Sequence, residues 1–262
     1  MGFFACLRSD PTLNFAAESD AALTPSSEAT GYPVENATIA DDIALRWRTT
    51  DAAFETVLFE FASARTIDFC ALVNHNLSSG ATIAVKAGTT SSVSDLSVSM
   101  TWREFDAWVK FSSTSKAFWK IEVADSGNAD GFIAIGLIML GVRQTLSFGF
   151  NNGWREVRNA INQSGRSTAG VANANIQRMF RQRSYSMAWN DLAASEVVSL
   201  VGNLLEPLHG DAEPLLVIPD IDIYQGAFVR QASQPEIEHV SWRQKTVEAT
   251  FTEEPRGVIT GA

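Results

Sequence analysis

The chain has 262 residues, a hydrophobic fraction of 45% and a formal net charge of −10. This length allows two hydrophobic cores of about 100–150 residues each, and the composition is typical of globular proteins rather than disordered or fibrous ones. A charge this negative argues against a protein dedicated to specific nucleic-acid binding, because such proteins carry a basic surface for the phosphates.

Residues 1–30 predict an extended N-terminal segment, because they are rich in Ala, Ser and Thr and show little periodicity. The first ten residues lack the basic-then-apolar order of a secretory signal, so we expect synthesis in the cytoplasm. The longest apolar run, 132–142, is about half the length that a membrane helix requires. We therefore expect no insertion into a membrane.

Residues 31–143 predict a β-sandwich. Apolar and polar residues alternate at 43–49 and at 55–62, which is the period of a half-buried strand. Residues 66–73 form a continuous apolar run, typical of a central strand covered on both faces. Further short strands with turn-forming connections, and no convincing helix between them, are indicated at 81–87, 107–111, 118–123 and 132–140.

Asn74, His75 and Asn76 follow the apolar run directly and are the best candidates for a ligand site. Amide and imidazole groups at a strand end can bind sugar hydroxyls, and Trp47 or Trp102 can stack on a sugar ring. The simpler interpretation is that Asn and His satisfy backbone groups in the tight connection after the strand. The sequence leaves both interpretations open.

No motif in the sequence indicates a catalytic or metal site. The three histidines are far apart, and there is no serine-nucleophile, zinc-protease or phosphate-loop motif. The acidic pair Asp41–Asp42 and the pair Asp220 and Asp222 lack the oxygen-rich loop of a calcium site, so solvated strand ends are expected. We expect no enzymatic activity, no metal and no cofactor.

Cys6 and Cys70 are the only cysteines. Two isolated thiols cannot form a zinc knuckle, and one disulfide is not a framework. Because Cys70 lies within the apolar run, it is predicted to be a small buried hydrophobic residue.

Residues 144–176 predict a long loop at the start of a second domain, because glycines and asparagines interrupt regular structure. Residues 143–190 hold seven arginines and one acidic residue, whereas the segments before and after are each acidic by eight charges. One interpretation is that the arginines dock on an acidic neighbouring subunit, because opposite surface potentials fix the register between docking partners. The alternative is a solvated loop whose arginines pair locally. The candidate intersubunit residues are Arg155, Arg158, Arg166, Arg178, Arg181 and Arg183.

Residues 177–262 predict an α+β domain with one helix. Residues 177–189 alternate as a strand does, and 191–208 carry apolar residues near helical spacing, with Asn190 or Asp191 as the N-cap. A strand, a helix and several returning strands in this order can close into a small barrel. The returning strands are expected at 214–218, 227–231, 237–243 and 246–252.

Short segments between Gly31 and Gly141 carry a first family resemblance. They are Ala40–Asp42, Leu45–Trp47, Val57–Phe61, Ile67–Leu77, Ala81–Val85, Phe118–Val123 and Gly131–Gly136. In this order they resemble the galactose-binding-like jelly rolls of phage structural proteins. The resemblance implies a jelly-roll sandwich, a fold whose members bind sugars or pack against neighbouring proteins.

The second half carries another resemblance, in the segments Arg183–Trp189, Ser195–Leu208, Pro214–Asp220, Val240–Trp242 and Val247–Thr252. These resemble the tail-tube-like domain of distal tail and minor tail-tip proteins of long-tailed phages. The resemblance implies a split barrel with one helix.

Together the two resemblances imply a non-enzymatic structural subunit of a phage tail tip or baseplate, located in the virion. Such a subunit is expected to form a hexameric or trimeric ring that joins the tail tube to hub or fibre proteins. The alternative function is a carbohydrate-binding module that contacts host surface glycans through Asn74, His75 and a nearby tryptophan.

Overall fold

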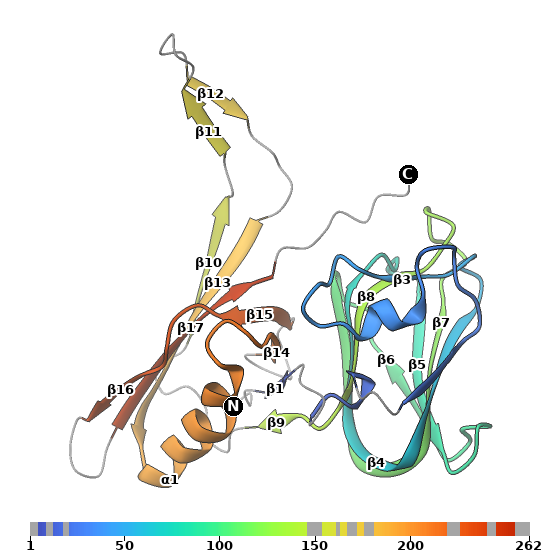
Figure 1. Ribbon diagram of the computed structural model, residues 1–262, viewed down its shortest axis with the longest axis horizontal. Helices are drawn as coiled ribbons and strands as arrows, with labels where there is room; N and C mark the ends of the chain where they lie inside the picture. The colour runs from blue at the N-terminus through green and yellow to red at the C-terminus, as the bar shows by residue number, and fades with distance from the viewer. Residues whose placement is uncertain are drawn as a thin grey trace. The chain divides into compact units, whose positions relative to one another are not determined.

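The protein is mainly β, with antiparallel sheets and one helical segment, as the sequence predicted. It divides into two compact units: the first contains Met1–Ser147, Glu213–Phe228 and Ile259–Ala262, and the second contains Phe148–Ala212 and Val229–Val258. The computed structural model (Figure 1) describes residues 5–8, 13–17, 21–145, 154–160, 163–166, 172–175, 181–218, 226–239 and 245–254. Within these residues, no helix is long and apolar enough to cross a membrane.

The first unit is built around an antiparallel β-sandwich with two short 3-10 helices. The strands pair in the order β3–β8–β4–β7–β5–β6, with β2 also beside β4. The elements are η1 (Phe15–Ala17), β2 (Ala22–Pro25), η2 (Val34–Thr38), β3 (Trp47–Arg48), β4 (Glu55–His75), β5 (Thr82–Gly88), β6 (Leu96–Met100), β7 (Asp106–Ala124) and β8 (Ala134–Gly141).

Two long strands, β4 and β7, pair along their length and belong to both layers of the sandwich. The first half of β4 pairs with β2 and the second half pairs with β8. Between these halves the β4–β7 register shifts, at Glu60/Arg65 and again at Ile67/Phe69. Such irregularities bend a sheet, and Figure 1 shows β4 curving at the lower end of the sandwich. Both ends of β4 therefore lie at the opposite end, where most connecting loops gather.

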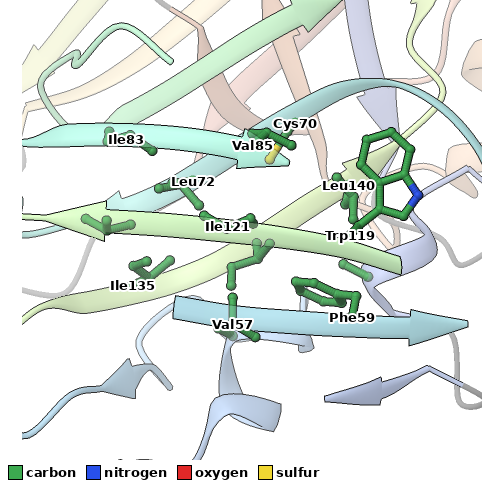
Figure 2. Close-up of a cluster of buried hydrophobic side chains, with 14 of the residues drawn as sticks. Val57, Phe59, Cys70, Leu72, Ile83, Val85, Trp119, Ile121, Ile135 and Leu140 are labelled. Atoms are coloured by element: carbon green, nitrogen blue, oxygen red, sulfur yellow. The ribbon is translucent and has the colours of Figure 1, made fainter. Parts of the chain in front are cut away.

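The inner core lies between the two layers (Figure 2) and confirms the predicted alternation. From the first half of β4, Val57 and Phe59 point inward, where they meet Trp119 of β7; from the second half, Cys70 and Leu72 do so. Each of these side chains is almost completely buried. Burial raises the pKa of the Cys70 thiol, which confirms its expected role as a small buried hydrophobic residue.

A second cluster covers the other face of the same half of β4, so the prediction of a strand covered on both faces is confirmed. Phe69 and Trp108 lie in this cluster, with ring centroids 6.0 Å apart. Their cover comes from much later in the chain, from Leu216, Ile218 and Phe228. Strand β14 (Leu215–Ile218), which supplies two of these residues, pairs with β1 (Ala5–Arg8), and β1 pairs with β9 (Gln144–Thr145).

The second unit is a sheet with the strand order β10–β13–β17–β15 and with β16 also beside β17. A separate two-stranded ladder joins β11 to β12. The strands are β10 (Trp154–Ala160), β11 (Gln163–Arg166), β12 (Ala172–Asn175), β13 (Arg181–Leu192), β15 (Ala227–Gln231), β16 (Glu236–His239) and β17 (Lys245–Glu253); β15 begins in the first unit.

One continuous helical segment follows β13. It begins as α1 (Ala194–Val197), continues as the π-helix η3 (Val198–Leu205) and ends as the 3-10 helix η4 (Glu206–Leu208). The predicted start at 191 is wrong by three residues, because Asp191 has a φ of 59° within an irregular part of the β13–β17 ladder. The N-cap is Ala193, whose backbone N–H donates to the Glu196 carboxylate over 2.7 Å.

The prediction of a long loop over 144–176 is also wrong. Strand β10 pairs with β13 over seven residues, and the β11–β12 ladder follows it. The local composition predicted irregular structure. Pairing with β13 nevertheless satisfies the backbone N–H and C=O groups of β10 and makes it a regular strand. The predicted boundaries also placed 213–228 in the second domain, whereas this stretch belongs to the first unit, in which Leu216, Ile218 and Phe228 pack on the sandwich.

Candidate ligand-binding surface

The predicted site residues Asn74 and His75 are buried where β4 ends, and the fold uses their polar atoms. Asn74 has a φ of 54°, and its Nδ2 donates to the carbonyl oxygen of Ile43 over 2.8 Å. Nδ1 of His75 accepts from the backbone N–H of Leu77 over 3.2 Å. His75 therefore stabilises the turn after the strand, as the simpler interpretation expected, whereas Asn74 holds the earlier segment at Ile43.

Asn76 fixes the loop that precedes β8. Its Nδ2 donates to Asp130 Oδ2 over 3.0 Å and to the carbonyl oxygen of Phe132 over 2.9 Å. Its Oδ1 accepts from the backbone N–H of Ala134 over 2.8 Å. With donors and acceptor engaged in this way, Asn76 is a positioning residue for Phe132.

Trp47 lies in the inner core and is only 1% exposed. Its Nε1 donates to the carbonyl oxygen of Ser27 over 3.0 Å. The prediction that this ring stacks on a sugar is wrong, because the ring is buried in the core. The reason is the inward orientation of the position in strand β3, next to Ile135 of β8.

The next residue, Arg48, lies at the rim of the sandwich beside two aromatic rings. Its guanidinium carbon is 3.7 Å from the ring centroid of Phe132 and 5.6 Å from that of Tyr32. The backbone N–H of Arg48 donates to the carbonyl oxygen of Tyr32 over 3.3 Å. The neighbouring Thr49 holds the Phe132 loop, because its Oγ accepts from the N–H of Ile133 over 2.9 Å.

Two aromatic side chains near this rim are exposed to solvent: Tyr32 at 39% and Phe54 at 58%. They lie on segments 26–32 and 48–56, which run beside each other. Backbone hydrogen bonds from Ser26 to Thr56 and from Ala29 to Arg48 join the segments. The exposed rings are thus carried by backbone that is held in place.

The electrostatics around Tyr32 are set by two arginines. Burial lowers the pKa of the Arg46 guanidinium, and the Coulombic interaction with Tyr32 opposes this shift. Nearby carboxylates accept hydrogen bonds from the protein: Glu28 from the Val34 N–H over 2.7 Å, and Asp51 from the Ala53 N–H over 2.8 Å. We define Tyr32, Arg46, Arg48 and Phe132 as the rim cluster; Phe54 is exposed on the adjoining segment.

The predicted intersubunit arginines have different surroundings. Arg155 is exposed on β10. Arg183 forms a two-point ion pair with the buried Glu253, with contacts of 2.8 Å from Nε and 2.6 Å from NH2. Arg178 and the side chains of Arg158, Arg166 and Arg181 lie outside the described residues. Arg183 therefore stabilises the β13–β17 pair, and the intersubunit role of the others stays a prediction.

Among the side chains that the structure describes, no group of three or more His, Cys, Asp or Glu residues could hold a metal ion. The residues predicted from the sequence, Asn74 to Asn76, lie at the same end of the sandwich as the rim cluster, but the rim cluster itself was not predicted. The alternation of Trp47 and Arg48 assigns them to opposite faces of a strand, and this signal was available. No local signal predicted that Phe132, 84 residues later, lies beside Arg48, because this contact depends on the pairing of β3 with β8.

Solved structures similar to this chain match about half of it. A chitosan-binding module from a Paenibacillus sp. IK-5 chitosanase/glucanase is 12% identical, with 49% of this chain and 98% of that chain covered and a TM-score of 0.40. The family 32 carbohydrate-binding module of Clostridium perfringens NanJ, in complex with galactose, is 17% identical, with 50% and 98% covered and a TM-score of 0.40.

A further C. perfringens module, in complex with GalNAc-β-1,3-galactose, is 13% identical, with 47% of this chain and 96% of that chain covered and a TM-score of 0.38. No protein-family model matches the chain, and no curated protein matches it.

Proposed function

We propose that the rim of the first unit binds a carbohydrate and that the chain acts by binding rather than by catalysis. The observation that carries this proposal is the exposure of Tyr32 and Phe54 on backbone segments fixed by hydrogen bonds. Exposed aromatic rings offer apolar surface that a ligand can cover, and aromatic residues are enriched at interaction sites. Because the backbone that carries these rings is held by hydrogen bonds, less of the chain must be ordered when a ligand binds.

The chemistry of the rim cluster suits a sugar better than a purely apolar ligand. A pyranose ring has an apolar face of C–H groups, which an aromatic ring can cover, and a perimeter of hydroxyls. Arg48 is available near Tyr32 to meet such polar groups, and binding sites generally combine an apolar surface with a few placed polar groups.

Binding of the complete chain to an array of immobilised glycans tests this proposal. We expect saturable binding to at least one glycan, and a loss of about tenfold or more in affinity in Tyr32→Ala or Phe54→Ala. Ile237→Ala is the matched control, because Ile237 is a similarly exposed apolar residue on β16 of the second unit. An array without any bound glycan, or equal losses in the control, contradicts the proposal.

A second candidate function, a structural subunit of a phage tail tip, is supported by the edge of the second unit. Among the described strands, β10 ends the sheet and has only β13 as its neighbour. An unpaired strand edge is a template for pairing with another chain. Arg155 is exposed on this edge strand, within the arginine-rich stretch of an otherwise acidic chain, so one copy complements the charge of the next.

Native mass measurement of the purified chain tests this second candidate. We expect a ring of several copies, and its dissociation by the charge reversal Arg155→Glu. Lys110→Glu is the matched control, because it makes the same charge change at an exposed position of β7 in the first unit. A monomer at high protein concentration, or equal dissociation by both variants, excludes assembly through β10.

A further inference from the structure

We infer that Arg48 binds a carboxylate, so that the carbohydrate recognised at the rim is an acidic sugar, such as a uronic or sialic acid, rather than a neutral one. This inference rests on the proposed function. It adds the chemical class of the ligand and names the side chain that selects it.

The first observation is the position of the guanidinium group. Its carbon lies 3.7 Å from the Phe132 ring centroid, with Tyr32 on the rim beside it at 5.6 Å. Contact with aromatic rings orients the planar guanidinium and leaves its edge, which carries the N–H groups, directed away from the rings. A group oriented before binding loses less freedom when it forms hydrogen bonds.

The Phe132 ring, on which Arg48 lies, belongs to a loop that is fixed by hydrogen bonds. Asn76 donates to the carbonyl oxygen of Phe132. The N–H of Thr49 donates to the carbonyl oxygen of Ile133 over 2.9 Å, and its Oγ accepts from the Ile133 N–H over 2.9 Å and donates to the same carbonyl over 3.3 Å. Phe132 is only 7% exposed. The ring that orients Arg48 is therefore part of the rigid fold and not of an adaptable surface.

The second observation is that the polar groups of Arg48 are not satisfied by the chain. Its Nε is buried and has no hydrogen-bond partner among the described residues, and no carboxylate there forms an ion pair with it. A carboxylate from solvent cannot reach the buried Nε, but it can accept from the two terminal nitrogens together, in the end-on two-point geometry for which a guanidinium is suited.

The contrast with the other arginines of the first unit supports a special role. Arg103 lies 3.9 Å from the Trp108 ring centroid, yet it donates to the Trp108 carbonyl oxygen over 2.8 Å. Arg143 lies 3.5 Å from the Asp68 carboxylate. Arg48 has the aromatic contact of the first but neither the carbonyl nor the carboxylate partner.

The charge around the rim also favours an anion. Arg46 lies on the same segment as Arg48, and a Coulombic interaction with Tyr32 acts on the pKa of its guanidinium. Of the acidic residues on the neighbouring segments, Glu28, Asp42 and Asp51 accept backbone hydrogen bonds, and Glu55 accepts from the Ser26 and Ser27 hydroxyls. An anionic ligand thus meets arginines whose charge is not paired by these carboxylates.

The test compares acidic oligosaccharides with their own carboxyl-reduced forms, which differ only by a carboxylate replaced with a primary alcohol. The probes are oligomers of galacturonate, glucuronate and mannuronate and a sialic-acid-terminated trisaccharide, each with its reduced counterpart, titrated into the complete chain by calorimetry. For at least one pair we expect about tenfold or tighter binding of the acid, because hydrogen bonds to charged groups are the stronger ones.

Two substitutions of Arg48 test whether this residue causes the preference for the acid. Arg48→Gln should reduce affinity for the acid to that for its reduced form, and Arg48→Lys should restore only part of the difference, because lysine lacks the planar two-point geometry. Arg65→Gln is the matched control, since Arg65 also lies near an aromatic ring, that of Phe15 at 5.7 Å, on the bend of β4. Circular dichroism and thermal unfolding verify that each variant is folded.

The outcomes separate the two levels of the proposal. Equal binding of acids and reduced forms overturns the inference on Arg48 but leaves carbohydrate binding intact, as does an acid preference that survives Arg48→Gln. No binding of any probe, acidic or neutral, overturns the inference on Arg48 whatever the glycan array shows. An array that is also empty overturns the proposed function with it.

Discussion

The two faces of the second half of β4 differ in where their covering residues come from in the sequence. Cys70 and Leu72 face a core that the strands of the sandwich close by themselves. Phe69 and Val73, on the other face, are covered with the help of residues more than 140 positions later, including Phe228. Equal burial thus arises in one case from neighbours within the domain and in the other from a returning segment.

This difference shows that the sandwich is not closed by residues 21–145 alone. The apolar side chains on its outer face form a cluster with Leu216 and Ile218, and the members of this cluster are as buried as those of the inner core. An isolated sandwich would leave this face in water, and contiguous exposed apolar patches lead to association. The first unit is therefore one folding unit made from separate stretches of the chain.

The largest expected effect comes from removing the cover. A chain that ends at Thr145 lacks Leu216, Ile218 and Phe228, whose burial stabilises the fold by roughly 5–9 kcal/mol at about 1.5–3 kcal/mol for each side chain. This approaches the whole stability of a typical domain. We expect residues 1–145 to bind a hydrophobic dye and to lack a cooperative thermal transition.

The matched control joins residues 213–228 to residue 145 through a flexible linker, which should restore a cooperative transition. If residues 1–145 alone unfold at the temperature of the complete chain, the outer cluster contributes little and the comparison of the two faces fails.

The second effect compares one substitution on the two faces. Phe59, in the inner core, and Phe228, in the outer cluster, are 0% and 1% exposed. Because both are equally buried, Phe59→Ala and Phe228→Ala should each reduce the free energy of unfolding by about 3–5 kcal/mol. Denaturant titration measures both values. A loss below about 1 kcal/mol in Phe228→Ala alone would show that the returning segment is loosely packed.

A smaller effect is expected at the rim. Asn76→Ala removes the hydrogen bonds to Phe132 and Ala134 and leaves their backbone groups without that partner. We expect a loss of about 1–3 kcal/mol in unfolding free energy and weaker glycan binding, because the ring beneath Arg48 is released. Asn128→Ala is the comparison, because it removes hydrogen bonds to the Asn76 carbonyl, Asp125 and the Asp130 N–H but none to Phe132 or Ala134. Equal glycan affinity in Asn76→Ala and the native chain would contradict the positioning role.

The smallest effect concerns an exposed pair far from both cores. The hydrogen bond from Lys116, at 2.7 Å, lowers the pKa of the Asp95 carboxyl below its ordinary value of 3.8. A carboxyl whose pKa is lower when folded stabilises the fold above its unfolded pKa, and this contribution is lost as the pH falls through its folded pKa. Melting temperatures between pH 2.5 and 7 should therefore fall slightly less steeply in Asp95→Asn. A melting temperature that falls more steeply with decreasing pH in Asp95→Asn than in the native chain would contradict this prediction.

The sequence predicted most strands of the sandwich because alternation is a local property. Val57 and Phe59 identify their strand without knowledge of its neighbours, and the run 66–73 identifies a strand covered on both faces. The returning segment escaped prediction because its apolar side chains reveal burial but not against which surface. The sequence assigned 214–218 to a strand, which is confirmed as β14 to within one residue, but to the wrong unit.

The rim cluster was only partly predictable for the same reason. Asn74 to Asn76 indicated the end of the sandwich at which the rim cluster also lies, since turn-forming polar residues follow buried strands. The choice of Trp47 as the stacking residue failed because strand alternation turns it inward and turns Arg48 outward. Recognising Phe132 as the partner of Arg48 requires the pairing of two strands more than 80 residues apart, which no local pattern contains.

The discontinuity of the first unit constrains how the chain folds as it is made. Protein synthesis proceeds from the N-terminus, and residues 213–228 leave the ribosome only after 148–212 have done so. The sandwich strands emerge early and must wait with an uncovered apolar face while much of the second unit is translated. The two units therefore mature together at the end of translation, and chaperones have a defined window in which to shield that face.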